Sequence, residues 1–153
     1  MFPTLKVLLI HCVVVTAFIG GAPCGMAEPA ASDQVHTPEK GSAERKGILD
    51  ALHKVYTTGS GSEVKFLVKH FKVHNGWAWI NVVPLDKNQK PEGEDWPSLL
   101  HLVNGQWVII DLIAINTDPE DQVGPMDPSA KYLRLVQKKC PGVPSDIFPK
   151  PSR

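Results

Sequence analysis

Two Asn-Gly dipeptides, Asn75-Gly76 and Asn104-Gly105, constrain the fold of this chain more than any other feature of its sequence. Each lies between apolar runs rich in β-branched and aromatic residues, a setting in which Asn-Gly favours a two-residue hairpin turn. We therefore predict one hairpin that pairs residues 64–74 with residues 77–85, and a second that pairs residues 98–103 with residues 106–115. Both pairs must be antiparallel, because parallel strands need a much longer connection.

The first hairpin has one apolar face and one mixed face, because the turn fixes which side chains share a face. The apolar face, which we predict to be core, holds Phe71, Val73, Ala78, Ile80 and Val82. The mixed face holds His70, Lys72, Trp77, Trp79 and Asn81. Aromatic groups among polar ones are common where proteins bind partners, so we interpret the mixed face as a candidate partner-binding surface, to which Trp96 adds. In the alternative, a helix or the C-terminal tail covers this face and its rings are core.

The second hairpin is apolar on both faces, as is typical of strands that are central in a sheet or covered on both sides. Two ionisable residues interrupt it, His101 and Asp111. An ionised carboxylate in an apolar strand is costly unless it is paired, so Asp111 is the best single candidate for a chemical site. It is a weak catalytic candidate, because a buried aspartate also serves as a structural hydrogen-bond acceptor. His101 is a second weak candidate, as a core histidine or as a titrating group in a pocket.

One helix is predicted before the hairpins and a shorter one after them. Ser42 suits the N-cap of the first, whose apolar stripe is Ile48, Leu49, Leu52, Val55 and Tyr56. The glycine-containing stretch 57–62 ends it. Asp127 and Pro128 are expected to begin the second helix, and Pro141 stops it. The order predicts an α+β domain in which an N-terminal helix packs on a curved four-stranded antiparallel sheet, with a short C-terminal helix.

This element order, over Arg45 to Asn116, resembles the cystatin-like group of folds, which includes the conical domains related to nuclear transport factor 2. The tryptophan that follows each turn, in Gly76-Trp77 and Gly105-Gln106-Trp107, belongs to the same resemblance. In such conical domains a lone acid on the sheet can act as a general base, so the resemblance gives Asp111 that role, with His101 or His70 to assist. The segments 48–52 and 76–79 also resemble small exported bacterial proteins of unassigned role.

The first 27 residues have the features of a secretory signal peptide. Lys6 supplies the positive charge, residues 7–19 form an apolar run, and Gly25-Met26-Ala27 is a small-x-small cleavage pattern. The run is shorter than the roughly 20 residues that span a bilayer. We expect an exported protein, periplasmic or secreted, with a signal peptide over 1–27, a disordered linker over 28–41, one globular domain over 42–139 and a Pro-rich tail over 140–153.

Charge and cysteine content exclude several classes of function. The chain carries 16 basic and 16 acidic residues, and removal of Lys6 with the leader leaves 15 against 16, a net charge of −1 with histidine neutral. A protein that binds nucleic acids or anionic membranes needs clustered positive charge on its surface. We therefore predict neither as a partner. Cys12 and Cys24 leave with the leader, so the remaining Cys140 is either a partly buried thiol or an intermolecular bridge.

The sequence gives no support for a metal or a cofactor, and we predict none. His70 and His74 are four strand residues apart, about 13 Å, which is too far for one metal to bind both. The acidic stretch lacks the EF-hand spacing and is predicted to be a solvated loop; it contains Asp118, Glu120, Asp121 and Asp127.

Two functions remain open at this point. The first is an exported cell-envelope binding protein without catalytic activity, which contacts a protein partner or its own copy through the aromatic face; inhibitor and immunity proteins belong to this class. The second is a small enzyme or ligand carrier whose pocket lies between sheet and helix, with Asp111 and His101 as its polar groups.

Overall fold

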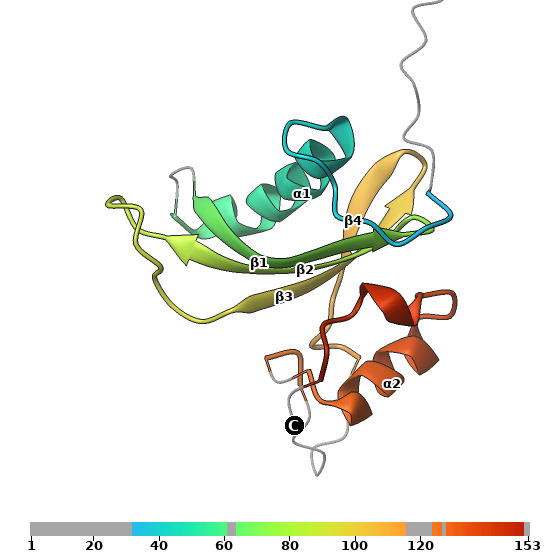
Figure 1. Ribbon diagram of the computed structural model, residues 1–153. Coiled ribbons are helices and arrows are strands. Elements are labelled where there is room, and N and C mark those ends of the chain that lie inside the picture. Colours follow the sequence, from blue (N-terminus) through green and yellow to red (C-terminus); the bar gives the residue numbers. More distant parts are fainter. Residues whose placement is uncertain (1–31, 61–63, 116–123, 127, 152–153) are drawn as a thin grey trace, which may run out of the picture.

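The computed structural model describes residues 32–60, 64–115, 124–126 and 128–151 of the 153-residue chain. Within these ranges the elements are helix α1 (Ala43–Ser60), strands β1 (Lys65–His74), β2 (Trp77–Leu85), β3 (Trp96–Val103) and β4 (Gln106–Ile110), helix α2 (Ala130–Lys139) and the 3-10 turn η1 (Ser145–Ile147). The described strands form one antiparallel sheet in the order β1-β2-β3-β4. The predicted α+β class is therefore confirmed (Figure 1).

Both Asn-Gly turns form as predicted. Asn75 and Gly76 have φ of 49° and 73°, and Asn104 and Gly105 have φ of 50° and 74°. Left-handed backbone at both central positions is the geometry of a type I′ turn, whose twist matches that of the strands. The predicted register is confirmed in both hairpins, with Phe71 opposite Ile80 in the first and the pairs Leu100↔Ile109 and Leu102↔Trp107 in the second.

Helix α1 covers one face of the sheet (Figure 1). Its N-cap is Ser42, as predicted, because the hydroxyl of Ser42 accepts a hydrogen bond of 3.2 Å from the backbone N–H of Arg45. Ile48 and Leu52 are fully buried against the predicted core face of the first hairpin and against Leu100. The helix runs to Ser60, beyond the predicted end at residue 57.

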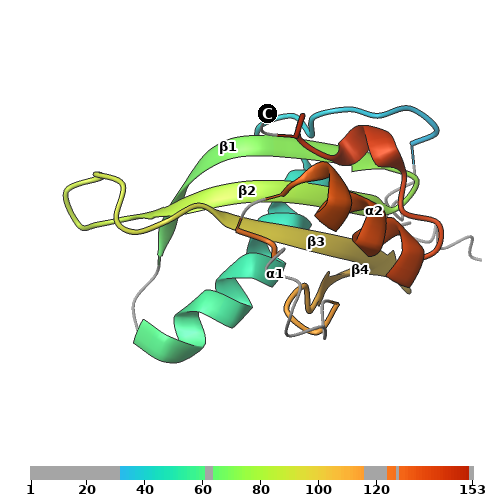
Figure 2. The same ribbon diagram turned by 90° about the horizontal axis from the view of Figure 1, so that it is seen from below.

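The other face of the sheet is also covered, by α2 and the C-terminal segment (Figure 2). Tyr132 and Val136 of α2 and Ile147 of η1 are fully buried in a second core cluster against the sheet. The sequence predicted one helix on one sheet, whereas the structure has three layers. The additional cover is needed because β2 is apolar on both faces, and burial of those side chains drives the packing of any segment that can reach them.

The α2 cap differs in detail from the prediction. Ser129 caps the helix, since its hydroxyl accepts a hydrogen bond of 3.2 Å from the backbone N–H of Tyr132. The predicted cap, Asp127, lies outside the described residues. Ser129 can act as the N-cap because its hydroxyl reaches a backbone N–H of the first turn that has no partner within the helix.

Strand β4 ends at Ile110, and the prediction that it continues to Ile115 is wrong. Continuing the observed register, in which Leu99 pairs with Ile110, would place Leu112 opposite Pro97. Proline has no N–H to donate to a neighbouring strand, so the ladder cannot continue there. The chain instead turns at Asp111, and this turn forms one wall of the site described below.

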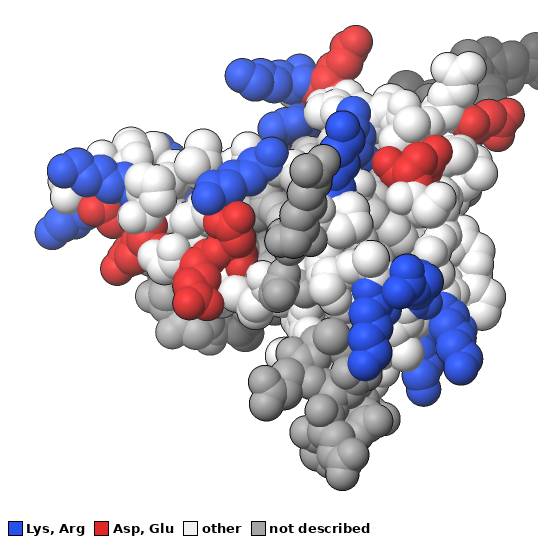
Figure 3. All heavy atoms as spheres, turned by 60° about the horizontal axis from the view of Figure 1, so that its bottom comes forward, with Lys and Arg blue, Asp and Glu red and all other residues white. Residues whose placement is uncertain are grey.

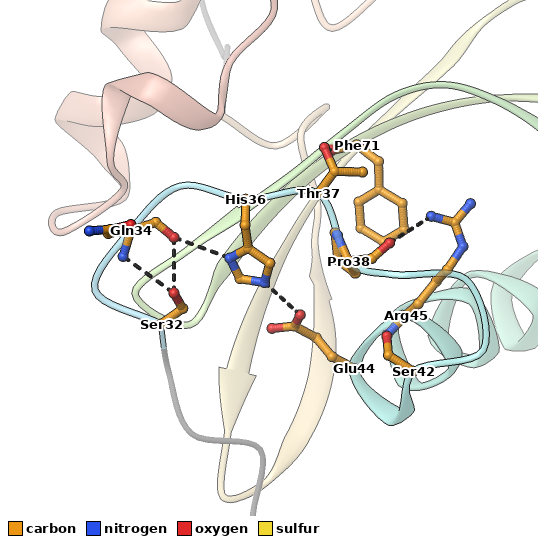
Figure 4. A network of polar contacts seen from close by, with 9 residues as sticks. All are labelled: Ser32, Gln34, His36, Thr37, Pro38, Ser42, Glu44, Arg45 and Phe71. Carbon is orange, nitrogen blue, oxygen red and sulfur yellow. Dashed lines mark hydrogen bonds and ion pairs between the residues drawn. The ribbon is translucent and has the colours of Figure 1, made fainter.

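The segment Ser32–Gly41 lies along β1, whereas a disordered linker was predicted over residues 28–41. His36 and Val73 exchange two backbone hydrogen bonds of 2.9 Å, and Thr37 Oγ1 donates to the carbonyl of Phe71 at 3.0 Å. Figure 4 shows the surrounding polar contacts, in which Arg45 reaches the carbonyl of Pro38 at 3.2 Å. Composition did not predict this segment because mainly hydrogen bonds attach it, with Pro38 as its one buried residue among those described. The predicted signal peptide, residues 1–27, lies outside the described residues.

Candidate functional site

The aromatic face that we interpreted as partner-binding is interior in this structure. Trp79 is 0% exposed and Trp77 is 9% exposed. The ring of Phe148 meets Trp79 edge-on, with centroids 5.1 Å apart, and Ile147 packs in the same cluster. The alternative noted above therefore holds, with α2 and the tail covering this face. A partner cannot reach either ring in this structure without displacing residues 143–148.

The polar residues of that face mostly attach other segments to it. His70 Nε2 hydrogen-bonds the carbonyl of Ile147 at 2.8 Å, and Asn81 Oδ1 accepts from the indole of Trp79 at 2.7 Å. Lys72 is half-buried on the same strand. His74 extends this set of contacts, with Nδ1 2.9 Å from the Asp146 carboxylate and Nε2 3.2 Å from the carbonyl of Asp33. His70 and His74 therefore position the terminal segments, and Asn81 holds the indole of Trp79.

Asp111, the strongest sequence candidate, is exposed and does not lie inside a strand. Its Oδ1 accepts hydrogen bonds from the backbone N–H groups of Ile113 at 3.0 Å and Ala114 at 3.3 Å. This is the local turn that aspartate favours. The prediction of a buried carboxylate in an apolar strand is therefore wrong, because it rested on a β4 that continued to Ile115.

His101 and Asp111 contact different parts of the protein. Its ring stacks on Trp77 with centroids 3.9 Å apart and an interplanar angle of 8°, on the face covered by α2. The structure therefore places the half-buried His101 against Trp77, beside the second core, and Asp111 after the end of β4. No contact among the described residues brings the two together as an acid–base pair.

A groove lies where the C-terminal half of α1 meets the start of β3 and the end of β4. We call it the α1–β4 groove; it has a volume of about 600 Å³. Its lining comes from α1, β3, β4, the turn after β4 and the segment before α2: Val55, Tyr56, Trp96, Pro97, Ser98, Ile109, Ile110, Asp111, Leu112, Ile113, Pro125 and Met126. Nearly all of these side chains are apolar or aromatic, which is usual for small-molecule sites.

One wall of the groove is the turn at residues 111–115, which is held by its contacts with the core on the α2 side of the sheet. Leu112 and Ile115 are buried in the α2-side core, and the hydroxyl of buried Tyr132 donates a hydrogen bond of 3.1 Å to the carbonyl of Leu112. Burial raises the pKa of Tyr132 far above its ordinary value, so this donor keeps its proton at any physiological pH. Ile113, between the two anchors, is left 78% exposed.

The opposite wall is aromatic. The rings of Tyr56 and Trp96 have centroids 4.1 Å apart and are tilted by 41°, and Phe66 supports Tyr56 edge-on at 5.3 Å. Tyr56 also forms a hydrogen bond to the buried Ser98 hydroxyl. Burial raises the pKa of Tyr56, partly opposed by this hydrogen bond. The wall is therefore rigid, with the polar atoms of Tyr56 and Ser98 satisfied by each other.

Large apolar side chains converge at the mouth of the groove. Beside Ile113, the exposed fractions are 58% for Val55, 51% for Met126 and 39% for Trp96. Single exposed apolar residues are ordinary on protein surfaces, but several around one hollow mark a binding site. The sequence prediction included Trp96 in a binding surface, but with the face of the first hairpin, and it missed the role of Val55, Ile113 and Met126. Pro97, just before the predicted strand, was a signal that β3 has an unpaired edge at this end.

Charge is distributed unevenly around the molecule. Asp111 is the one charged residue among the described residues that line the groove. Basic side chains gather instead on the outer face of α2, where four are exposed and Figure 3 shows them clustered: Lys131, Arg134, Lys138 and Lys139. Net charge alone could not reveal this patch, because it counts residues without placing them.

Comparisons with protein-family models, with curated protein sequences and with solved structures found no match. Among the described residues, no three His, Cys, Asp or Glu side chains are grouped so as to hold a metal ion. The helices in the described ranges are too short or too polar to cross a membrane. The α1–β4 groove is therefore the feature of the described residues that bears most on function.

Proposed function

We propose that this protein is a non-enzymatic binding protein that holds an apolar ligand in the α1–β4 groove. The observation that carries the proposal is the convergence of Val55, Trp96, Ile113 and Met126, all substantially exposed, on one hollow of about 600 Å³. A volume of this size is typical of small-molecule sites. Bound ligand would remove these side chains from water and so gain hydrophobic free energy.

The chemistry of the lining favours a carrier over an enzyme. None of the lining residues is a histidine, cysteine or lysine, and the hydroxyls of Tyr56 and Ser98 are engaged with each other. Oδ1 of Asp111 accepts a hydrogen bond from the backbone N–H of Ile113. His101 stacks on Trp77, and neither residue lines the groove. The described lining therefore holds no second carboxylate, histidine or lysine that could form an acid–base pair with Asp111.

The predicted signal peptide adds a second part to the proposal, which is that the carrier acts outside the cytosol, in the periplasm or after secretion. Its test is the mass of the protein recovered from the envelope fraction of its host. We expect a chain that begins at Glu28. Recovery of the full-length chain from the cytosol would contradict this part and leave the carrier proposal standing.

The groove is tested with N-phenyl-1-naphthylamine, a neutral apolar dye whose fluorescence rises on leaving water. At about 0.3 kcal/mol per non-hydrogen atom, the dye should bind with a dissociation constant of roughly 0.1 mM. Replacing Ile113 or Met126 by Gln should weaken binding several-fold without loss of stability, because both side chains are exposed.

Val103→Gln is the matched control, because Val103 is also exposed but does not line the groove. Equal losses in all three variants, or no binding by the unaltered protein, would contradict the carrier proposal. If the dye failed to bind and a protein partner protected Ile113 and Met126 from hydrogen exchange, the function through a protein partner would be favoured instead.

A further inference from the structure

We infer that the α1–β4 groove selects a small amphiphile with a cationic head, such as an alkylammonium, over neutral or anionic ones. This inference rests on the proposed function and adds the charge of the ligand. Asp111 follows the end of β4, on the rim of a groove whose other described lining residues carry no charge. Its exposed carboxylate faces water, while the apolar lining extends away from it along Ile109 and Ile110.

One oxygen of the Asp111 carboxylate is available to bind a ligand. Oδ1 accepts from the N–H groups of Ile113 and Ala114, whereas Oδ2 makes no hydrogen bond or ion pair with the described part of the chain. Among the described residues that line the groove there is no lysine, arginine or histidine. The negative charge is therefore not neutralised by the lining, and a cation at this position would supply the missing partner.

The aromatic wall of the groove also favours a cationic head group over an anionic one. The rings of Tyr56 and Trp96 line the groove, and aromatic rings attract cations placed over their faces. The basic cluster on α2 does not oppose this preference, because Lys131, Arg134, Lys138 and Lys139 are not among the lining residues. An anionic head, as in a fatty acid, would meet only the carboxylate and would be repelled.

The energetic effect is moderate, because Asp111 is exposed and water screens its charge. Two unit charges about 4 Å apart in water interact with a strength that corresponds to about a fivefold change in affinity. Most of the binding free energy therefore comes from the apolar tail, and the charge decides among ligands with the same tail.

The test uses three probes with one octyl tail: octyltrimethylammonium, 1-octanol and octanoate, each below its micelle concentration. Their dissociation constants are measured by displacement of N-phenyl-1-naphthylamine. We expect the cation to bind about fivefold more tightly than the alcohol, and the anion more weakly than the alcohol. The preference should decrease as salt is raised, since ions screen exposed charges.

Asp111→Asn should abolish the preference because it removes the charge, while an asparagine oxygen can still accept from the two backbone N–H groups. Asp111→Ser is a second variant that keeps a turn-forming acceptor if the first is unstable. Glu92→Gln is the control, because it removes an exposed carboxylate outside the groove and should leave the preference intact.

The outcomes separate the two proposals. Equal binding of all three probes, or a preference for the cation that survives both Asp111 variants, would overturn the charge inference and leave the carrier function standing. Failure of every probe to displace the dye would count against the carrier function itself.

Discussion

His36 and Glu44 are joined by a hydrogen bond of 2.7 Å between the imidazole Nε2 and the carboxylate Oε2, which connects the N-terminal segment to the first turn of α1 (Figure 4). The other ring nitrogen lies 3.1 Å from the carbonyl of Gln34. His36 also pairs with Val73 through its backbone. One residue therefore attaches a segment of low apolar content both to the sheet and to the helix.

This contact predicts a pH dependence of stability. Burial, the largest single influence, lowers the pKa of His36, and Lys72 lowers it slightly; the hydrogen bonds to Glu44 and Gln34 and the charge of Glu44 together outweigh them, so the pKa is raised above its ordinary 6.5. A folded-state pKa above the unfolded one gives stability that is fully present below the unfolded pKa and is lost as the pH rises through the folded pKa.

Urea unfolding at about pH 5.5 and about pH 8 measures this contribution, which should be under about 1 kcal/mol because the pair is partly exposed. The contribution of His36, taken as the difference between the unaltered protein and His36→Gln, should be larger at the lower pH. Glu44→Gln should reduce this difference in the same way, whereas His53→Gln should not. An equal effect of His36→Gln at both pH values would show that the ion pair does not contribute.

The C-terminal segment should be an integral part of the core. Ile147 is 0% exposed and lies among Trp77, Trp79 and the buried side chains of α2. Replacing it by alanine should lower the free energy of unfolding by about 2–5 kcal/mol, the cost of deleting a large buried aliphatic group. It should also increase the exposure of Trp79, measured by acrylamide quenching of fluorescence. Lys150→Ala, an exposed change in the same tail, is the control, and a similar small effect of both would contradict the position of Ile147 in the core.

The sequence allowed prediction of those parts of the fold that depend on neighbours in the chain. Asn75-Gly76 and Asn104-Gly105 set both turns, and the turns set the register, so the face shared by Phe71, Ile80 and Val82 could be predicted residue by residue. Ser42 as the N-cap of α1 followed from equally local chemistry. In each case the deciding interaction spans only a few residues.

The errors arose where the deciding contact is distant in sequence. The end of β4 depends on Pro97, which lies on the neighbouring strand, so the alternation from Trp107 onward could not reveal it. The burial of Trp79 depends on Phe148, at the other end of the domain. The α1–β4 groove combines residues from α1, two strands, the turn after β4 and the segment before α2, and only the folded chain brings Val55 and Ile113 to one hollow.

Helix α1 should tolerate no side chain at Gly47. A Cβ built there would lie 3.1 Å from Cδ1 of Trp107, so the indole ring, whose Nε1 is buried without a hydrogen-bond partner, would have to move. Alanine in a helix interior normally gains about 1 kcal/mol over glycine. We expect Gly47→Ala to lose that gain and to destabilise the protein, whereas in a Trp107→Leu background the same change should stabilise it by about 1 kcal/mol. Thermal unfolding of the four proteins in the double-mutant cycle measures the coupling, and additivity within about 0.5 kcal/mol would show that helix and indole are not in contact.

The turn at Asp111 should depend on an acceptor at that position and not on its charge. Because Oδ1 accepts from Ile113 and Ala114, Asp111→Ala leaves two backbone donors to water and should cost about 1 kcal/mol, whereas Asp111→Asn should cost much less. Chemical denaturation gives both values. Hydrogen exchange at Ile113 and Ala114 then localises the effect, since alanine should speed exchange there while leaving the amides of β2 protected. Equal costs for the two variants would mean that the carboxylate charge stabilises the turn, and would remove the basis for using Asp111→Asn as a change of charge alone in the ligand experiments.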